Sequence, residues 1–194
     1  KAYKKRKKSE YFSKAGGKIS AYDDLFKKYA NTIGWDWRLL ASMAYQESQF
    51  DPAARSWAGA IGLMQIMPAT AIYLGVDDPS VPENNIRAAV KYLNELQEKF
   101  PSVKDSTEKI KFVLASYNVG PNHVEDARRL ATKYGDDENT WNNNVELWIL
   151  KKSQKEFYTD EVVKYGYCRG TEPFKYVTEI IDRYKQYKLF IKAK

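Results

Sequence analysis

The chain has 194 residues, of which 43% are hydrophobic and 29% are charged. This balance is ordinary for a globular protein and excludes disorder along the whole chain. A single cysteine, Cys168, excludes an internal disulfide scaffold.

Positive charge is concentrated at the amino terminus. Residues 1–18 hold eight basic side chains and one acidic one, a net charge of +7. This equals the formal net charge of the whole chain. A fold that binds nucleic acid is expected to carry its positive charge on the folded surface. We therefore predict a basic leader or linker at residues 1–18, one domain at residues 19–194, and no nucleic-acid partner.

Helical periodicity dominates after the leader. Ser20 is the expected N-cap of the first helix, and Gly34 ends it. Apolar residues at three- to four-residue spacing predict helices at about residues 20–33, 36–49, 85–100, 109–118, 122–134 and 173–190. We expect residues 141–170 to form a helix and then a long irregular segment. Strand patterns are scarce, so the sequence predicts an all-α fold.

Residues 56–76 contain no charged side chain, which raises the question of a membrane span. Three glycines and Pro68 make the segment a poor apolar helix of the required length. We predict a loop that enters a short helix at Pro68, a residue suited to the first helical turn.

Glu47 interrupts the apolar face of the second predicted helix. This face contains Leu40, Met43 and Ala44, and the next position at the same spacing is 47. Burial would raise the pKa of the carboxyl group, as a general acid near neutral pH requires. Alternatively, Glu47 points to solvent or pairs with a base such as Arg55, and periodicity alone does not decide between these.

Several short motifs occur in an order that is typical of one enzyme family. Glu47-Ser48, Gly62-Leu63-Met64-Gln65, Ala115-Ser116-Tyr117-Asn118 and Tyr176 resemble the motifs of lytic transglycosylases of the goose-lysozyme-like superfamily. Residues 45–48, 126–128 and 165–170 are similar to the membrane-bound lytic murein transglycosylase F group. The resemblance covers roughly residues 20–190.

The resemblance implies a lysozyme-like helical domain with a saccharide-binding groove. The implied reaction cleaves the β-1,4 bond between N-acetylmuramic acid and N-acetylglucosamine in peptidoglycan, forming a 1,6-anhydro ring without consuming water. Most glycosidases need two carboxylates. Only Glu47 stands out near the motifs, since Asp51 precedes Pro52 in a predicted turn. One carboxyl group suffices if the substrate's 6-hydroxyl is the nucleophile and Glu47 acts first as acid and then as base.

The resemblance also implies substrate-binding roles. Ser56 would orient the acid or contact the substrate, Gly62–Gln65 would line the groove with Gln65 bonded to an acetamido group, and Tyr117, Asn118 and Tyr176 would lie near the acid. The family also places a methionine near the groove, at Met64 or Met67. From the residues alone, Met64 and Met67 are better explained by packing and Tyr117 as core. Tyr176 is equally well explained as core, and Ser56 as an ordinary loop residue. Trp35, Trp37 and Trp57 flank the Glu47 motif, and their rings suit either sugar faces or a core.

We expect no metal, because one histidine, His123, and one cysteine cannot build a His/Cys cluster. We also expect no cofactor. The implied partner is the peptidoglycan glycan strand, bound by a monomer. The implied location is the periplasm or outer membrane of a Gram-negative bacterium, with membrane association only through parts outside this chain.

Two alternatives stay open. One is a lysozyme-like hydrolase on the same fold, which would need a second carboxylate or a held water. The other is a non-catalytic peptidoglycan-binding module, which the intact Glu47, Gln65, Tyr117 and Asn118 disfavour.

Overall fold

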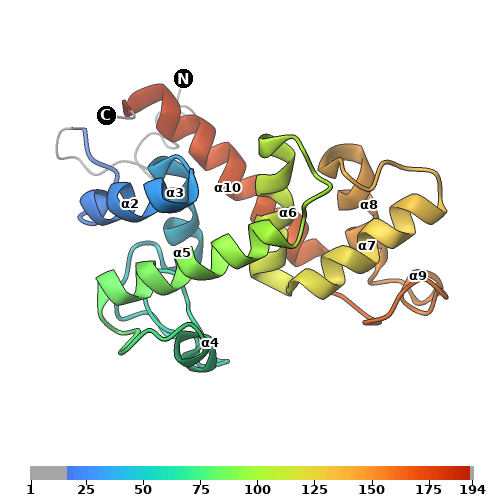
Figure 1. Cartoon of the computed structure of the whole chain (residues 1–194), viewed down its shortest axis with the longest axis horizontal. Helices are drawn as coiled ribbons and strands as arrows, with labels where there is room; N and C mark the ends of the chain where they lie inside the picture. The colour runs from blue at the N-terminus through green and yellow to red at the C-terminus, as the bar shows by residue number, and fades with distance from the viewer. Residues whose placement is uncertain (1–16, 193–194) are drawn as a thin grey trace, which may run out of the picture. The chain divides into compact units, whose positions relative to one another are not determined.

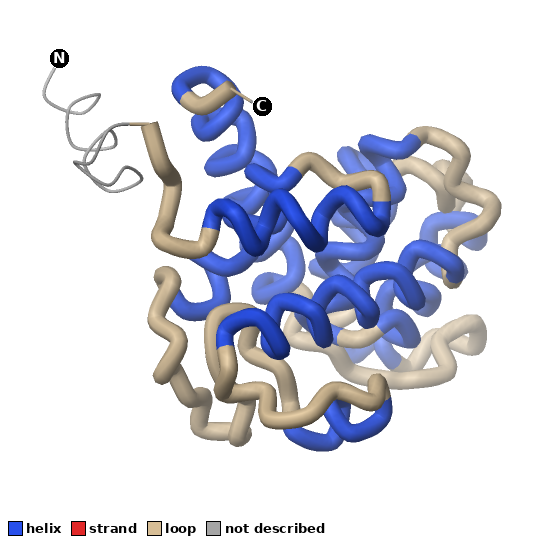
Figure 2. Tube along the Cα trace, turned by 60° about the vertical axis from the view of Figure 1, so that its left-hand side comes forward, coloured by secondary structure: helices blue, strands red, loops and turns tan. Residues whose placement is uncertain are grey.

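The computed structural model describes residues 17–192, which are helices joined by turns and loops (Figure 1). In chain order the elements are α2 (Asp23–Ala30), the 3-10 turn η1 (Asn31–Ile33), α3 (Trp37–Ser48), α4 (Pro68–Tyr73), α5 (Pro82–Glu98), α6 (Ser106–Val119), α7 (Pro121–Lys133), the π-helical turn η2 (Trp141–Val145), α8 (Glu146–Lys151), α9 (Lys155–Tyr158) and α10 (Thr171–Phe190). Figure 2 shows helix and loop but no strand along these residues, which confirms the all-α prediction.

Two compact units make up the described chain. The first comprises residues 17–92 and 179–192, and the second comprises residues 93–178. Glu47 and the loop before α4 belong to the first unit, whereas Tyr117, Asn118 and Tyr176 belong to the second. Residues 1–16 of the predicted basic leader lie outside the described part, and the assignment of residues 19–194 to one domain stays a prediction.

Helices α2 and α3 pack together in the first unit (Figure 1). Their apolar faces bury Phe26, Leu40 and Met43 completely. Asp36 caps α3, since its carboxylate accepts a hydrogen bond from the backbone N–H of Arg38 at 2.9 Å. The helix that carries Glu47 is therefore fixed at its start and along its buried face.

The first helix begins later than predicted. Ser20 is not its N-cap: the hydroxyl of Ser20 accepts from the backbone N–H of Tyr22, and α2 begins only at Asp23. The Asp23 carboxylate accepts from the N–H groups of Ile19 and Ser20, both at 2.8 Å. These bonds form a turn before the helix, because a side chain inside the first helical turn reaches backward to the backbone.

Two other helices begin three residues before their predicted starts. Pro82 opens α5, because proline fits a first helical position that needs no N–H donor. Asp105 caps α6 by accepting from the N–H groups of Thr107 and Glu108. The apolar pattern shows only the part of each helix that faces the core.

The buried side chain of Asp126 contacts several separate segments of the second unit. Its carboxylate pairs with Lys152 Nζ at 2.6 Å, and both side chains are fully buried. It also accepts from the backbone N–H groups of Lys164 and Tyr165, at 2.8 and 2.9 Å. Burial opposes ionisation, but these donors outweigh it and hold the pKa of Asp126 below its usual value. The motif at 126–128 thus anchors the irregular segment that carries the motif at 165–170.

Within residues 17–192 no helix has both the length and the apolar character needed to cross a membrane. The charge-free residues 56–76 form turns followed by the six-residue α4, as predicted.

Candidate functional site

Glu47 lies in the last turn of α3. One turn earlier, Met43 and Ala44 are fully buried, whereas Glu47 has intermediate exposure. The helix ends directly after Ser48, because Gln49 adopts the left-handed conformation with φ of 53°. The carboxyl group therefore sits where the buried face of α3 meets the surface.

Ser48 connects the end of α3 to a loop further along the chain. Its Oγ lies 2.8 Å from the carbonyl oxygen of Leu63 and 3.1 Å from that of Ala44. Leu63 belongs to the Gly62–Gln65 motif, so one hydroxyl joins two of the motifs that the sequence singled out. The structure brings these two motifs together.

The loop at residues 54–66 is built on a small antiparallel ladder. Arg55 pairs with Ile61, and Ile61 pairs with Ile66. Ile61 and Ile66 exchange two backbone hydrogen bonds of 3.0 Å. The turn at residues 56–60 closes one end, where Ser56 Oγ accepts from the N–H of Ala60 at 2.9 Å. Ser56 thus orders its own turn by its side chain.

Asn85 on α5 holds the other turn of this loop. Its Oδ1 accepts from the N–H of Met64 at 2.7 Å, and its Nδ2 donates to the carbonyl oxygens of Ile61 and Pro79, both at 2.8 Å. The side chain is fully buried. A Cβ on Gly62 would lie only 2.7 Å from Asn85 Nδ2, and Gly62 has φ of +78°. The motif needs glycine here for both its space and its backbone conformation.

Gln65 uses its amide nitrogen inside the loop. Nε2 donates to the carbonyl oxygens of Gly62 at 2.9 Å and Ala54 at 3.3 Å. The backbone of Gln65 has a positive φ of 48°, which is uncommon outside glycine. These bonds fix the orientation of the side chain without any ligand.

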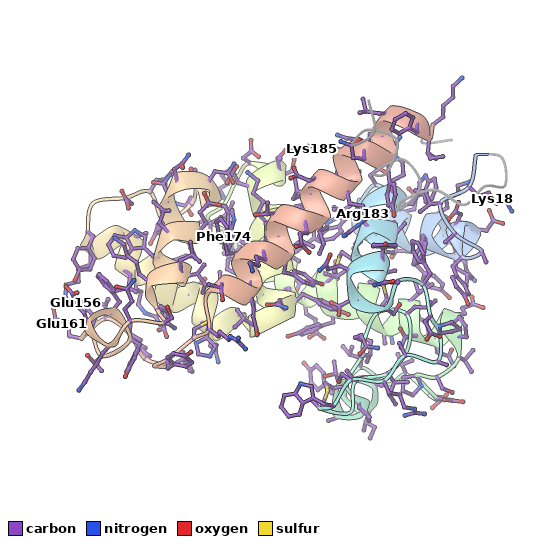
Figure 3. All side chains as sticks on the ribbon, turned by 180° about the vertical axis from the view of Figure 1, so that it is seen from behind. Lys18, Glu156, Glu161, Phe174, Arg183 and Lys185 are labelled. Carbon is purple, nitrogen blue, oxygen red and sulfur yellow. The ribbon has the colours of Figure 1, made fainter. Side chains whose placement is uncertain are left out.

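Arg183 on α10 forms hydrogen bonds to the last turns of α3 (Figure 3). Residue 183 and the whole of α3 belong to the first unit. Its Nη1 donates to the carbonyl oxygen of Ser42 at 3.2 Å, and its Nη2 donates to Gln46 Oε1 at 2.9 Å. The Nε2 of Gln46 in turn donates to Glu179 at 2.9 Å. The residue before Glu47 is held at both ends of its amide group.

The remaining candidate residues differ in exposure. Leu63 and Met64 are fully buried and Met67 is 40% exposed, so Met67 presents more surface to solvent than Met64 does. In the second unit, Tyr117 has intermediate exposure, Asn118 is exposed near the end of α6, and Tyr176 is buried at the start of α10.

Sequence reasoning missed Asn85 as a site-forming residue. On α5 the positions 85, 89, 93 and 96 share one face, and the side chains of Ala89, Leu93 and Leu96 are fully buried. Asn85 is thus a polar residue at an inward position, the same signal that singled out Glu47. Arg183 is likewise a charged residue at an inward position of α10, between the buried Ile180 and Tyr187, but the sequence does not indicate which helix it contacts.

Known proteins resemble this chain across most of its length. It is 40% identical over 167 residues to the membrane-bound lytic murein transglycosylase F of Desulfosudis oleivorans, covering 86% of this chain and 36% of that protein. The protein of the same name from Vibrio cholerae is 42% identical over 169 residues, covering 87% and 31%. The chain therefore spans about a third of the length of these relatives.

Solved structures share the fold. The 70 kDa soluble lytic transglycosylase Slt70 of Escherichia coli superposes with a TM-score of 0.56 at 26% identity, covering 88% of this chain and 24% of Slt70. The lytic transglycosylase Slt of Pseudomonas aeruginosa gives a TM-score of 0.60 at 23% identity, covering 89% and 25%. The fold is thus the lysozyme-like helical fold of these enzymes.

The transglycosylase SLT domain family matches residues 24–140, a range that includes Glu47, the Gly62–Gln65 turn, Asn85 and Tyr117. Because the match covers more than half of the sequence, the chain belongs to the transglycosylase SLT domain family.

Proposed function

We propose that this chain is the catalytic part of a lytic murein transglycosylase that cleaves the N-acetylmuramic acid-β-1,4-N-acetylglucosamine bond of peptidoglycan. The observation that carries the proposal is the position of Glu47. In a member of the transglycosylase SLT domain family, this carboxyl group ends a buried helix face beside Ser48, whose hydroxyl contacts the Gly62–Gln65 turn.

The reaction needs one protein carboxyl group. Protonated Glu47 gives its proton to the glycosidic oxygen as the bond from that oxygen to C1 of the muramic acid breaks. The 6-hydroxyl oxygen of the same sugar then bonds to C1, and its proton passes to the Glu47 carboxylate. The acid is regenerated, no water is consumed, and the intramolecular attack gains from proximity.

The loop at residues 54–66 would bind sugar close to the acid. Leu63 and Met64 are buried, so they support the turn by packing while its backbone approaches the substrate. Gln65 already uses Nε2 within the loop, so Oε1 is the atom it would offer to an acetamido N–H. Ser56 would act through its ordered turn, and Gly62 would act by letting the turn pack against Asn85.

Further substrate contacts are assigned to Met67, Tyr117, Asn118 and Tyr176. The partial exposure of Met67 and Tyr117 and the exposure of Asn118 support this assignment. For Tyr176, which is buried, a supporting role through the start of α10 agrees best with its 6% exposure.

The glycan strand is the proposed partner, and the protein would act as a monomer in the periplasm or at the outer membrane. The names of the curated relatives, which are membrane-bound murein enzymes, support a cell-envelope location. Any attachment to the membrane would come from parts outside this chain.

The products of purified peptidoglycan, separated by chromatography and identified by mass spectrometry, test the proposal. We expect muropeptides ending in 1,6-anhydro-muramic acid, which are about 18 Da lighter than hydrolysis products. Glu47→Gln should keep the fold and lower the rate roughly 100- to 10,000-fold. Glu161→Gln is the matched control, because the Glu161 side chain is 82% exposed and should leave activity unchanged.

Other outcomes would overturn the proposal. Reducing ends in place of anhydro ends would identify a hydrolase and require a second carboxylate or a held water. Peptidoglycan binding without any product would identify a binding module. Full activity of Glu47→Gln would move the acid role to another residue.

A further inference from the structure

Trp57 is the most exposed large apolar side chain in the described structure. Its relative exposure is 101%, whereas Trp35 and Trp37 are buried at 6%. A side chain of this size is normally at least partly covered, and exposed aromatic rings are enriched where proteins bind other molecules. The exposure of Trp57 therefore indicates a surface at which another molecule binds.

This exposure does not come from a loosely held backbone. Trp57 lies in the turn at residues 56–60, where Ser56 N donates to Ala60 O at 3.0 Å and Gly59 N donates to Ser56 O at 3.0 Å. Ser56 Oγ adds a third bond, from the N–H of Ala60. The ring thus projects from a turn that is already ordered, which reduces the entropy lost on binding.

The ladder places this turn relative to the rest of the loop. Ile61 pairs antiparallel with Ile66, so the chain after Ile66 runs back toward the end of the ladder that the turn at 56–60 closes. Met67, the next residue, lies at that end. The turn at residues 62–65, which Asn85 holds, closes the opposite end. Trp57 and the partly exposed Met67 therefore share one end of the ladder.

The chemistry around Trp57 fits an uncharged ring. No charged residue occurs from 56 to 76, and the exposed Arg55, which precedes the turn, is the only charged residue from 52 to 76. An indole offers a flat apolar face with one N–H donor at its edge, which matches a pyranose ring with its apolar C–H face and its polar rim. Interfacial membrane helices, by contrast, carry Lys and Arg on a polar face, and the six-residue α4 has neither.

We propose that Trp57 is a stacking platform for an N-acetylated sugar of the glycan strand, outside the bond-breaking centre. This inference rests on the proposed function, because it assumes that the loop faces glycan. Trp57 then contributes to the affinity for glycan and to KM, and it takes no part in proton transfer.

Binding without turnover tests the proposal in the Glu47→Gln background. The probes are soluble N-acetylglucosamine oligosaccharides, titrated by calorimetry, and insoluble peptidoglycan in a sedimentation assay. Adding Trp57→Ala should weaken binding roughly tenfold, since one aromatic contact is worth on that order. Trp57→Phe keeps a flat ring and should recover part of the affinity. Ile72→Ala is the control, because Ile72 is 79% exposed in the same charge-free segment and should bind like its parent.

Equal binding by Trp57→Ala and its parent overturns the proposal, as does a parent that binds neither probe. Loss of binding to neutral phosphatidylcholine vesicles in Trp57→Ala, with glycan binding unchanged, overturns it in favour of a lipid surface. The proposed function fails separately, if wild-type protein yields no anhydro muropeptides while Trp57-dependent glycan binding persists.

Discussion

The side chain of Asn85 occupies the space that a Cβ on Gly62 would need, at 2.7 Å from the position of that atom. The two residues are 23 positions apart, and together they shape the turn that Ser48 joins to the end of α3. The glycine-containing motif is therefore incomplete without a residue that lies outside it.

Gly62→Ala should destabilise the protein by about 2–4 kcal/mol, through a positive φ and a clash with a buried, hydrogen-bonded amide. Gly59→Ala is the control, because Gly59 has φ of +91° but nothing within 4 Å of the position that an added methyl group would take, and it should cost only about 1 kcal/mol. Urea unfolding measures both. Combining Gly62→Ala with Asn85→Ala should be less than additive, and strict additivity would contradict the clash.

Asn85→Asp should lower stability at neutral pH by about 3 kcal/mol, because an ionised carboxylate would face the carbonyl oxygens of Ile61 and Pro79. The loss should shrink at acid pH, where a protonated carboxyl group can donate one of the two bonds. Asn84→Asp is the matched control on the same helix, since Asn84 is only half-buried, and it should change stability by less than about 0.5 kcal/mol. Thermal melts from neutral to acid pH measure the effect, and a pH-independent loss would argue against it.

The helices and the unusual position of Glu47 could be predicted from the sequence, because both depend on a local pattern. The stripe of Leu40, Met43 and Ala44 gives α3 and marks position 47 as unusual. The ladder at Arg55, Ile61 and Ile66 could not be predicted in this way, since pairing between short segments leaves no periodic signal. The role of Arg183 was equally hidden, because it depends on which helix packs against α3.

Asp36→Asn should remove a pH-dependent contribution to the stability of the helix that carries Glu47. Burial opposes ionisation of Asp36, but hydrogen bonds from the side chain and backbone of Arg38 and from Tyr184 outweigh it and lower its pKa. A carboxyl group with a lowered pKa stabilises the folded state above its unfolded pKa of about 3.9, and this is lost as the pH falls through the folded value.

Asparagine is an equally good N-cap, so Asp36→Asn keeps the cap. It removes the charge and, with one oxygen, the acceptor for the bonds that Oδ2 receives from Arg38 and Tyr184. We expect it to be about 1 kcal/mol less stable than wild type at neutral pH, and the difference should vanish well below the usual aspartate pKa. Urea unfolding across this pH range is the measurement. Asp24→Asn, at a side chain that is 92% exposed, should match wild type throughout. A difference for Asp36→Asn that persists at low pH would show that geometry, rather than charge, is responsible.

Arg183→Lys should impair the positioning of Glu47 more than the binding of substrate. Lysine keeps the positive charge, but it cannot bond Ser42 and Gln46 at once in the planar geometry of a guanidinium group. The last turn of α3 would then be held less firmly, and small displacements of a catalytic group are costly. We expect kcat on purified peptidoglycan to fall roughly ten- to hundredfold, with KM little changed. Arg169→Lys is the matched exchange at a side chain that is 72% exposed, and it should leave both parameters unchanged. If Arg183→Lys lowered the melting temperature while kcat stayed at the wild-type value, Arg183 would stabilise the fold without positioning the acid.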